Sequence, residues 1–271
     1  MSRTTRLPKT WVIKLGTGIL SLPNGQLDLD QIHTLSRQIA ILKRSMRIHP
    51  ILVTSGAIGA GMTTLNLKKR PTIIEQLQSC AAIGQPLLMH HYETAFRTHN
   101  LHIAQILLTY LDLDSRQLYT NTRKTLLYLL SLPNIIPIIN ENDVVSYEEI
   151  KFGDNDRLSA HVAAMIPADL LVLLTTVDGL YSKPNGTGQL IRRLTQITPK
   201  VEAMAGNTPH TRSVGGMTTK LLAARIAQEA GIPTRIANGR TPDVLIQLAR
   251  GRSIGTLIQS TTKTSSNKSS P

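Results

Sequence analysis

The chain has 271 residues, 41% of them hydrophobic, which is enough to bury a full core without disulfides or metals. Its formal net charge is +13, but aromatic residues make up only 3% and the basic residues are scattered, which argues against a nucleic-acid-binding protein. Cys80 is the single cysteine, and no segment approaches the roughly 18 apolar residues of a membrane span. We therefore expect a cytoplasmic protein in which Cys80 is a buried apolar side chain.

Strand-like apolar runs alternate with helical patterns along the chain. Most of the runs are short and rich in Val, Ile and Leu, which is typical of parallel strands covered on both faces. The predicted strands are 11–15, 51–54, 103–108, 135–139, 170–175, 234–237 and 256–259. The predicted helices are 30–45, 73–98, 115–131, 155–166, 218–230 and 242–250. This alternation predicts a doubly wound α/β protein.

No long flexible linker interrupts the series of predicted strands and helices, which favours one domain. We expect a single domain over residues 1–259 and a disordered tail, rich in Ser and Thr, at 260–271. Polar residues mark helix starts, with Asp28 or Asp30 capping the first helix and Ser115 capping its own.

Residues 141–156 hold six of the seventeen acids of this basic chain. The stretch contains Asn140-Glu-Asn-Asp143 after one predicted strand and Gly153-Asp-Asn-Asp156 at the start of a predicted helix. Capping the helix needs one residue, whereas several amides and acids gather on neighbouring strand and helix ends. Such groups can bind an ammonium, hold Mg²⁺ or orient lysines. Glu148 and Glu149, in the intervening loop, are expected to face solvent.

Three glycine-containing segments lie where strands end or helices begin, the usual place of ligands in open α/β sheets. They are Lys14-Leu-Gly-Thr-Gly18, Val53-Thr-Ser-Gly-Ala-Ile-Gly-Ala-Gly61 and Val214-Gly-Gly-Met-Thr-Thr-Lys220. Glycine lets the backbone approach an anion, and free amides with a lysine can neutralise phosphate charge. Each segment can also be a simple turn, a close helix contact or a surface loop. None has the spacing of a Walker A loop or a dinucleotide fingerprint.

Two further observations concern nucleotide and metal binding. Thr175 and Thr176 close the fifth predicted strand, where a nucleotide can lie in the crevice of the sheet. The eight histidines contain no HxxxH or HxxEH pair, so a metal site built from histidine and cysteine is not expected.

Taken in order, six motifs of the chain resemble those of the amino acid kinase family. They are KLGT at 14–17, VTSGAI at 53–58, NEND at 140–143, GDND at 153–156, DGLY at 178–181 and GGMTTK at 215–220. The combination of VTSGAI, NEND and GDND is similar to that of the glutamate 5-kinase branch. The resemblance implies a three-layer α/β/α sandwich with a mainly parallel central sheet, with a front substrate lobe of about residues 1–166 and a rear nucleotide lobe of about 167–259.

The resemblance also implies an activity and its participants. The γ-phosphoryl group of ATP, with Mg²⁺, would pass to the side-chain carboxylate of L-glutamate in the first step of proline biosynthesis. A carboxylate is ionised at neutral pH and is already a nucleophile, so the reaction needs alignment and charge neutralisation rather than a strong base. A homo-oligomer is expected, and glutamyl phosphate reductase is a possible partner.

Roles for individual residues are carried over from the same motifs. Lys14 and Lys220 would neutralise the moving phosphoryl group, with Asp156 between them as organiser. The residues expected to bind glutamate are Ser55, Asp143, Asn155, Asp154 and Thr17. The residues expected to hold ATP are Lys14, Gly16, Thr175, Thr176, Val214, Gly215, Gly216, Met217, Thr218, Thr219 and Lys220.

The chain departs from the family pattern in three places. Thr176 stands where an aspartate is common, Val214 replaces the threonine of a GTGGM motif, and we expect a short form without the C-terminal PUA-type domain of many bacterial members. Two alternatives stay open at this point. One is another family activity, on acetylglutamate, aspartate or uridylate, and the other is a non-catalytic nucleic-acid-binding or regulatory protein with the same fold.

Overall fold

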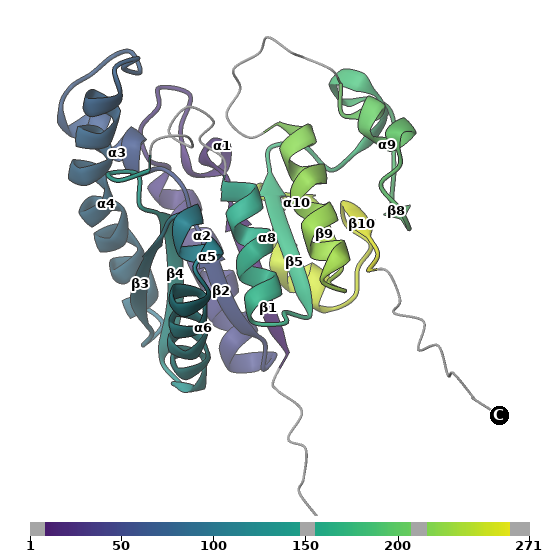
Figure 1. Ribbon diagram of the computed structural model, residues 1–271, viewed down its shortest axis with the longest axis horizontal. Coiled ribbons are helices and arrows are strands. Elements are labelled where there is room, and N and C mark those ends of the chain that lie inside the picture. The colour runs from purple at the N-terminus through teal and green to yellow at the C-terminus, as the bar shows by residue number, and fades with distance from the viewer. Residues whose placement is uncertain (1–8, 147–154, 207–215, 261–271) are drawn as a thin grey trace, which may run out of the picture.

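The computed structural model describes residues 9–146, 155–206 and 216–260, which form a central eight-stranded sheet covered by helices on both faces (Figure 1). The strand order is β3-β4-β2-β1-β5-β9-β10-β8. The strands of this sheet are β1 Thr10–Leu15, β2 His49–Val53, β3 His102–Leu108, β4 Ile135–Glu141, β5 Leu170–Thr175, β8 Arg193–Leu194, β9 Thr234–Asn238 and β10 Thr256–Ile258. Among the strand pairs described for this eight-stranded sheet, only that of β9 with β10 is antiparallel, so the expected mainly parallel sheet is confirmed.

Helices occupy the segments between the strands. They are α1 Thr17–Leu20, α2 Leu29–Ser45, α3 Ala57–Thr64, α4 Ile74–Arg97, α5 Tyr110–Asp114, α6 Arg116–Ser131, α8 Asn155–Met165, α9 Pro199–Met204, α10 Met217–Glu229 and α11 Val244–Ala249. A short hairpin of β6 (Tyr181–Lys183) and β7 (Thr187–Leu190), joined by a 3-10 turn at Pro184–Gly186, lies outside the main sheet. Each predicted strand and helix is matched by an element in the same place. The predicted caps are confirmed, because Asp28 accepts a hydrogen bond from the Gln31 N–H at 3.0 Å and Ser115 from that of Leu118 at 3.4 Å.

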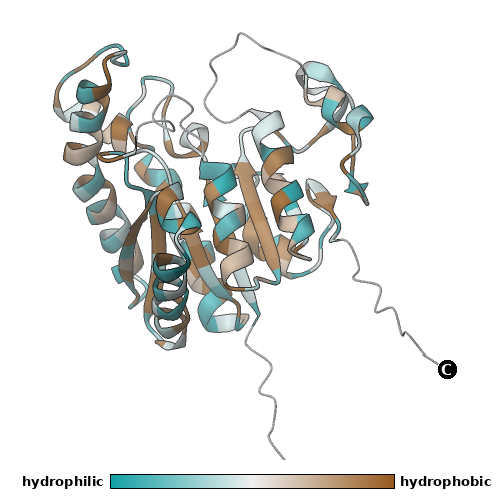
Figure 2. Cartoon of the chain, viewed as in Figure 1, coloured by the Kyte–Doolittle hydropathy of each residue, from teal (hydrophilic) through white to brown (hydrophobic). Residues whose placement is uncertain are grey.

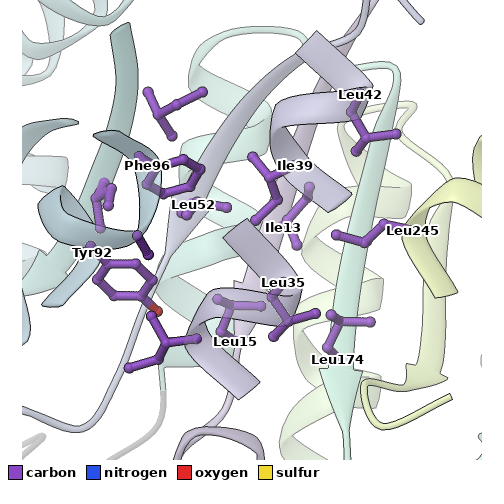
Figure 3. Packing of buried hydrophobic residues seen from close by; sticks show 14 of the residues in the cluster. Ile13, Leu15, Leu35, Ile39, Leu42, Leu52, Tyr92, Phe96, Leu174 and Leu245 are labelled. Atoms are coloured by element: carbon purple, nitrogen blue, oxygen red, sulfur yellow. The ribbon is translucent and has the colours of Figure 1, made fainter. Parts of the chain in front are cut away.

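Strand β1 runs through the centre of the sheet, and its alternate residues face opposite helical layers. Trp11, Ile13 and Leu15 pack against α2, α4 and α11, and Figure 3 shows Ile13 and Leu15 in this layer. Val12 faces the other layer, which α6, α8 and α10 form. Hydrophobic colour runs along β5 in Figure 2, as expected for a strand covered on both faces. Since side chains alternate, Lys14 lies on the same face as Val12, toward α8 and α10.

Parallel pairing brings several strand ends to one edge of the sheet. Lys14 of β1 is in register with Val53 of β2 on one side and with Leu173 of β5 on the other. The residues that follow β2 and those that end β4 and β5 therefore meet near Lys14. The strand order changes direction at β1 and β5, which is the point where open sheets of this type bind ligands.

Helices α3 and α4 pack unusually closely beside this edge. A Cβ atom on Gly61 would lie 1.9 Å from the carbonyl oxygen of Cys80, and one on Gly84 would lie 1.8 Å from that of Ala57. Cys80 is fully buried in this contact, so its predicted role as a packed apolar side chain is confirmed. The two glycines hold the first turn of α3 against α4.

Three further expectations concern membrane-spanning segments, the C-terminal tail and the division into two lobes. No helix within the described ranges is long and apolar enough to cross a membrane. The tail predicted at 260–271 falls outside the described residues from 261 onward. The division into two lobes near residue 167 stays a prediction.

Candidate active site

A buried carboxylate joins two lysines that come from opposite ends of the chain. Lys14 is the penultimate residue of β1, Asp156 is the second residue of α8, and Lys220 is the fourth residue of α10. Lys14 Nζ lies 2.6 Å from Asp156 Oδ1, and Lys220 Nζ lies 3.0 Å from Asp156 Oδ2. Thr219 Oγ1 also donates a hydrogen bond to Oδ2 at 3.0 Å. We call Lys14, Asp156 and Lys220 the lysine bridge.

The lysine bridge is almost closed to solvent, since Lys14 is 3%, Asp156 0% and Lys220 4% exposed. Burial alone would raise the pKa of Asp156, but the charges of Lys14 and Lys220 and their hydrogen bonds hold it well below its usual range. Asp156 is therefore an ionised carboxylate. Two ammonium groups around one carboxylate leave a local excess of positive charge, which suits the binding of an anion.

A first pocket opens beside the lysine bridge at the ends of β2 and β4. Its lining residues are Thr17, Ser55, Gly56, Ile58, Gly59, Arg70, Asn140, Glu141, Asp143 and Asn155. Gly56, the N-cap of α3, has φ 110°, a conformation that favours glycine, and it turns the chain sharply into the helix. The structure thus brings together Thr17, Ser55, Asp143 and Asn155, the described residues of the predicted glutamate site.

A row of side-chain amides fixes the wall of this first pocket. Asn155 Nδ2 donates hydrogen bonds to the carbonyl oxygen of Thr54 at 2.5 Å and to Asn140 Oδ1 at 2.8 Å. Asn140 Nδ2 in turn donates to Gln85 Oε1 at 2.7 Å. Because protein acceptors engage the nitrogen of Asn155, its oxygen is oriented to accept a hydrogen bond from a ligand. We call Gln85, Asn140 and Asn155 the amide relay.

A second pocket lies on the other side of the lysine bridge. Its lining residues are Thr175, Thr176, Val177, Gly179, Leu180, Tyr181, Gly186, Met204, Ala205, Gly216, Met217 and Lys220. Thr175, Thr176, Gly216, Met217 and Lys220 all belong to the predicted nucleotide site. The start of α10 forms part of the wall, where free backbone amides favour an anion.

The two pockets share the lysine bridge. Asn155 lines the first pocket and is adjacent in sequence to Asp156, while Lys220 itself lines the second. Anions bound in the two pockets would therefore meet at a fixed, buried cluster of positive charge. This arrangement can align an anionic donor with an anionic acceptor and lower the repulsion between them.

The remaining predicted site residues have different surroundings. Gly16 lies beside the bridge, where an added Cβ would be 3.4 Å from Lys14 Nζ. Thr218 is exposed on α10, and Thr219 contacts Asp156. Three predicted site residues lie outside the described part of the chain: Asp154, Val214 and Gly215. The predicted solvent-facing residues Glu148 and Glu149 also lie outside it.

Three residues of the first pocket and its wall were not singled out from the sequence. Arg70 belongs to the run Lys-Lys-Arg-Pro, which has the composition of a solvated turn. Glu141, which accepts a hydrogen bond from Ser146 Oγ at 2.5 Å, was seen only as part of an acidic motif. Gln85 lies within an otherwise apolar stretch of α4, where it is buried. A polar residue in such a stretch was the one signal in the sequence that could have indicated its role.

Comparison with known proteins identifies the family of this chain. The glutamate 5-kinase of Moorella thermoacetica is 45% identical over 249 residues, which cover 91% of this chain and 65% of the relative. The glutamate 5-kinase of Methylobacillus flagellatus is 47% identical over 92% of this chain and 67% of its own length, and that of Thermus thermophilus is 45% identical over 92% and 66%. The chain thus spans about two thirds of the length of these relatives. Residues 9–238 match the amino acid kinase family as a whole, and the chain belongs to that family.

Proposed function

We propose that the chain is an ATP-dependent glutamate 5-kinase, which phosphorylates the side-chain carboxylate of L-glutamate to L-glutamyl 5-phosphate in the first step of proline biosynthesis. The observation that carries this proposal is the lysine bridge between two pockets. The choice of glutamate is supported by relatives at 45–47% identity that bear the name glutamate 5-kinase.

The first pocket would hold L-glutamate with its side-chain carboxylate toward the lysine bridge. Ser55 lies at the buried end of this pocket and would donate its hydroxyl to that carboxylate, with Thr17 nearby and Asn155 as part of the adjoining wall. Asp143, a half-buried acid in the same lining, would bind the substrate ammonium. Asp154 would assist from the segment outside the described residues.

The lysine bridge would lower the barrier by neutralising charge. The attacking group and the transferred phosphoryl group are both anionic, so positive charge fixed between them favours their approach. Asp156 holds both ammonium groups in place, and its two oxygens are engaged by Lys14 and Lys220. The acceptor carboxylate has no proton to lose, so Asp156 acts as an organiser and not as a general base.

The second pocket would hold ATP, with its phosphates at the start of α10 and against Lys220. Thr175 and Thr176 offer hydroxyl groups to the nucleotide, and Thr176 brings no charge where family members commonly carry an aspartate. Mg²⁺, when bound, would be held by the phosphate oxygens, which are the hard ligands this ion prefers, and would neutralise phosphate charge.

The product has consequences for partners. An acyl phosphate reacts readily with water, so rapid transfer to glutamyl phosphate reductase is part of the proposal, as are a homo-oligomeric state and a cytoplasmic location. A second chain or a reductase that binds this protein would be detected by analytical ultracentrifugation of the purified components.

An acceptor panel tests the proposal. The chain is incubated with ATP, Mg²⁺ and hydroxylamine, which traps an acyl phosphate as a coloured hydroxamate, and L-glutamate is compared with L-aspartate and N-acetyl-L-glutamate. Phosphorylation of uridylate is measured in parallel as the release of ADP. We expect the largest rate with L-glutamate. Turnover of another acceptor, with none of glutamate, would overturn the assignment.

A further inference from the structure

The mechanism described above gives no role to Arg70, a basic residue in the lining of the first pocket. We propose that Arg70 binds the α-carboxylate of L-glutamate and thereby makes the enzyme select acceptors that carry this group. This inference rests on the proposed function and adds a specificity-determining residue to it.

The charges of the substrate require a cation in this pocket. L-glutamate carries an ammonium group and two carboxylates, and the side-chain carboxylate must face the lysine bridge to react. Asp143 is the acid proposed to bind the ammonium, and Glu141 is a second acid in the lining. Among the lining residues that the structure describes, Arg70 alone has a basic side chain. Without it, the α-carboxylate would face two acids with no opposite charge, which costs binding energy.

Arg70 lies at the end of the first pocket where the α-carboxylate of a bound glutamate would be, as the exposure of the lining residues indicates. Ser55 and Asn155 are buried and lie next to the lysine bridge, whereas Asp143 is half-buried and Arg70 is exposed at the rim. The two carboxylates of glutamate are at opposite ends of the molecule. When the side-chain carboxylate reaches the inner end, the α-carboxylate is left toward the rim.

Arg70 and Asp143 also lie close enough to interact. Arg70 is exposed as a whole residue, but partial desolvation of its guanidinium lowers its pKa, and the charge of Asp143 acts in the opposite direction. The ammonium and the α-carboxylate of an amino acid share one carbon atom, so they need an acid and a base that are neighbours. Arginine suits this task because its planar guanidinium can donate two parallel hydrogen bonds to one carboxylate.

The test compares two substrates that differ only at the α-carboxylate. Isoglutamine, the α-amide of L-glutamate, keeps the ammonium and the reacting carboxylate but has a neutral group in place of the α-carboxylate. We expect the parent chain to prefer L-glutamate over isoglutamine in kcat/KM. Arg70→Met should lower kcat/KM for L-glutamate by about 10- to 100-fold, the usual effect of losing a charged hydrogen bond, and leave isoglutamine nearly unchanged.

Two further variants complete the experiment. Arg70→Lys keeps the charge and should recover part of the preference. Lys69→Met is the matched control, because Lys69 is the exposed neighbouring cation and is absent from the first-pocket lining. Unchanged kinetics in Arg70→Met, or an equal loss with both substrates, would overturn the inference while leaving the glutamate 5-kinase proposal in place. A parent chain inactive with L-glutamate would overturn the proposed function itself.

Discussion

Asp156 is ionised and shielded from water between Lys14 and Lys220. A buried charge is stable only with partners, and removing one member of a buried pair typically costs about 3–5 kcal/mol. Apolar side chains of the same size would fill this space at least as stably. We therefore interpret the lysine bridge as a functional feature of the fold.

The depressed pKa of Asp156 has a consequence for acid stability. The unfolded chain binds a proton at this residue near the ordinary value of about 4, while the folded chain does so only at lower pH. The stabilising contribution of Asp156 is therefore complete above about pH 4 and is lost as the pH falls below it. We predict that the free energy of unfolding, measured with urea, decreases less steeply across this range in Asp156→Asn than in the parent chain.

A matched control distinguishes this effect from general acid unfolding. Asp30 is an exposed carboxylate of α2, so Asp30→Asn should follow the pH dependence of the parent chain. If Asp156→Asn and the parent lose stability with the same slope, Asp156 is not held ionised by the two lysines.

At the scale of elements, helices α3 and α4 shape the first pocket. The close contacts at Gly61 and Gly84 fix the first turn of α3, and α4 carries Gln85 to the back of the pocket wall. Gln85 is absent from the pocket lining, so it is a positioning residue that would act through Asn140 and Asn155.

The amide relay predicts a kinetic effect of Gln85. Gln85→Leu removes the acceptor for Asn140 Nδ2, so Asn140 and Asn155 lose their fixed orientation. We expect KM for L-glutamate to rise by about tenfold, the typical effect of one hydrogen bond, with little change in KM for ATP. Gln76→Leu, the same change at an exposed position of α4, serves as the control. A KM for glutamate that stays at the parent value would contradict the relay.

The elements differ in how well the sequence predicts them. Long apolar repeats predict α2, α4 and the central strands, because burial on both faces of the sheet leaves a clear pattern. Helices α1, α5 and α9 and the strands β6, β7 and β8 span six residues or fewer and carry no such repeat. Their positions depend on contacts with distant parts of the chain.

In the candidate site, too, residues without a local sequence pattern are not predicted. The motifs containing Lys14, Asp156 and Lys220 stand out in the sequence, and a family resemblance indicates that they belong to one site. Arg70 and Gln85 have no local signal of this kind. Arg70 reaches the lining of the first pocket from the connection between α3 and α4, and Gln85 reaches its wall from α4 through a hydrogen bond with Asn140.

At the scale of the whole molecule, the sheet order explains how the site is assembled. Strand β1 lies between β2 and β5, so Lys14 lies between the strand ends that border the first and second pockets. Helices α8 and α10 cover one face side by side and bring Asp156 and Lys220 to the same point (Figure 1). One change of direction in the sheet thus creates both pockets and the charge between them.

The most direct test of this account is the rate of hydroxamate formation by Lys14→Met compared with Lys43→Met. Lys43 is also a buried lysine, but it belongs to α2 and donates to the carbonyl oxygen of Leu132 at 3.2 Å, away from both pockets. We predict that Lys14→Met lowers kcat for L-glutamate by about 100- to 1,000-fold, as expected for the loss of a preorganised charge, while Lys43→Met stays within about threefold of the parent chain. Parent-like turnover by a folded Lys14→Met variant would contradict the claim that the lysine bridge carries phosphoryl transfer.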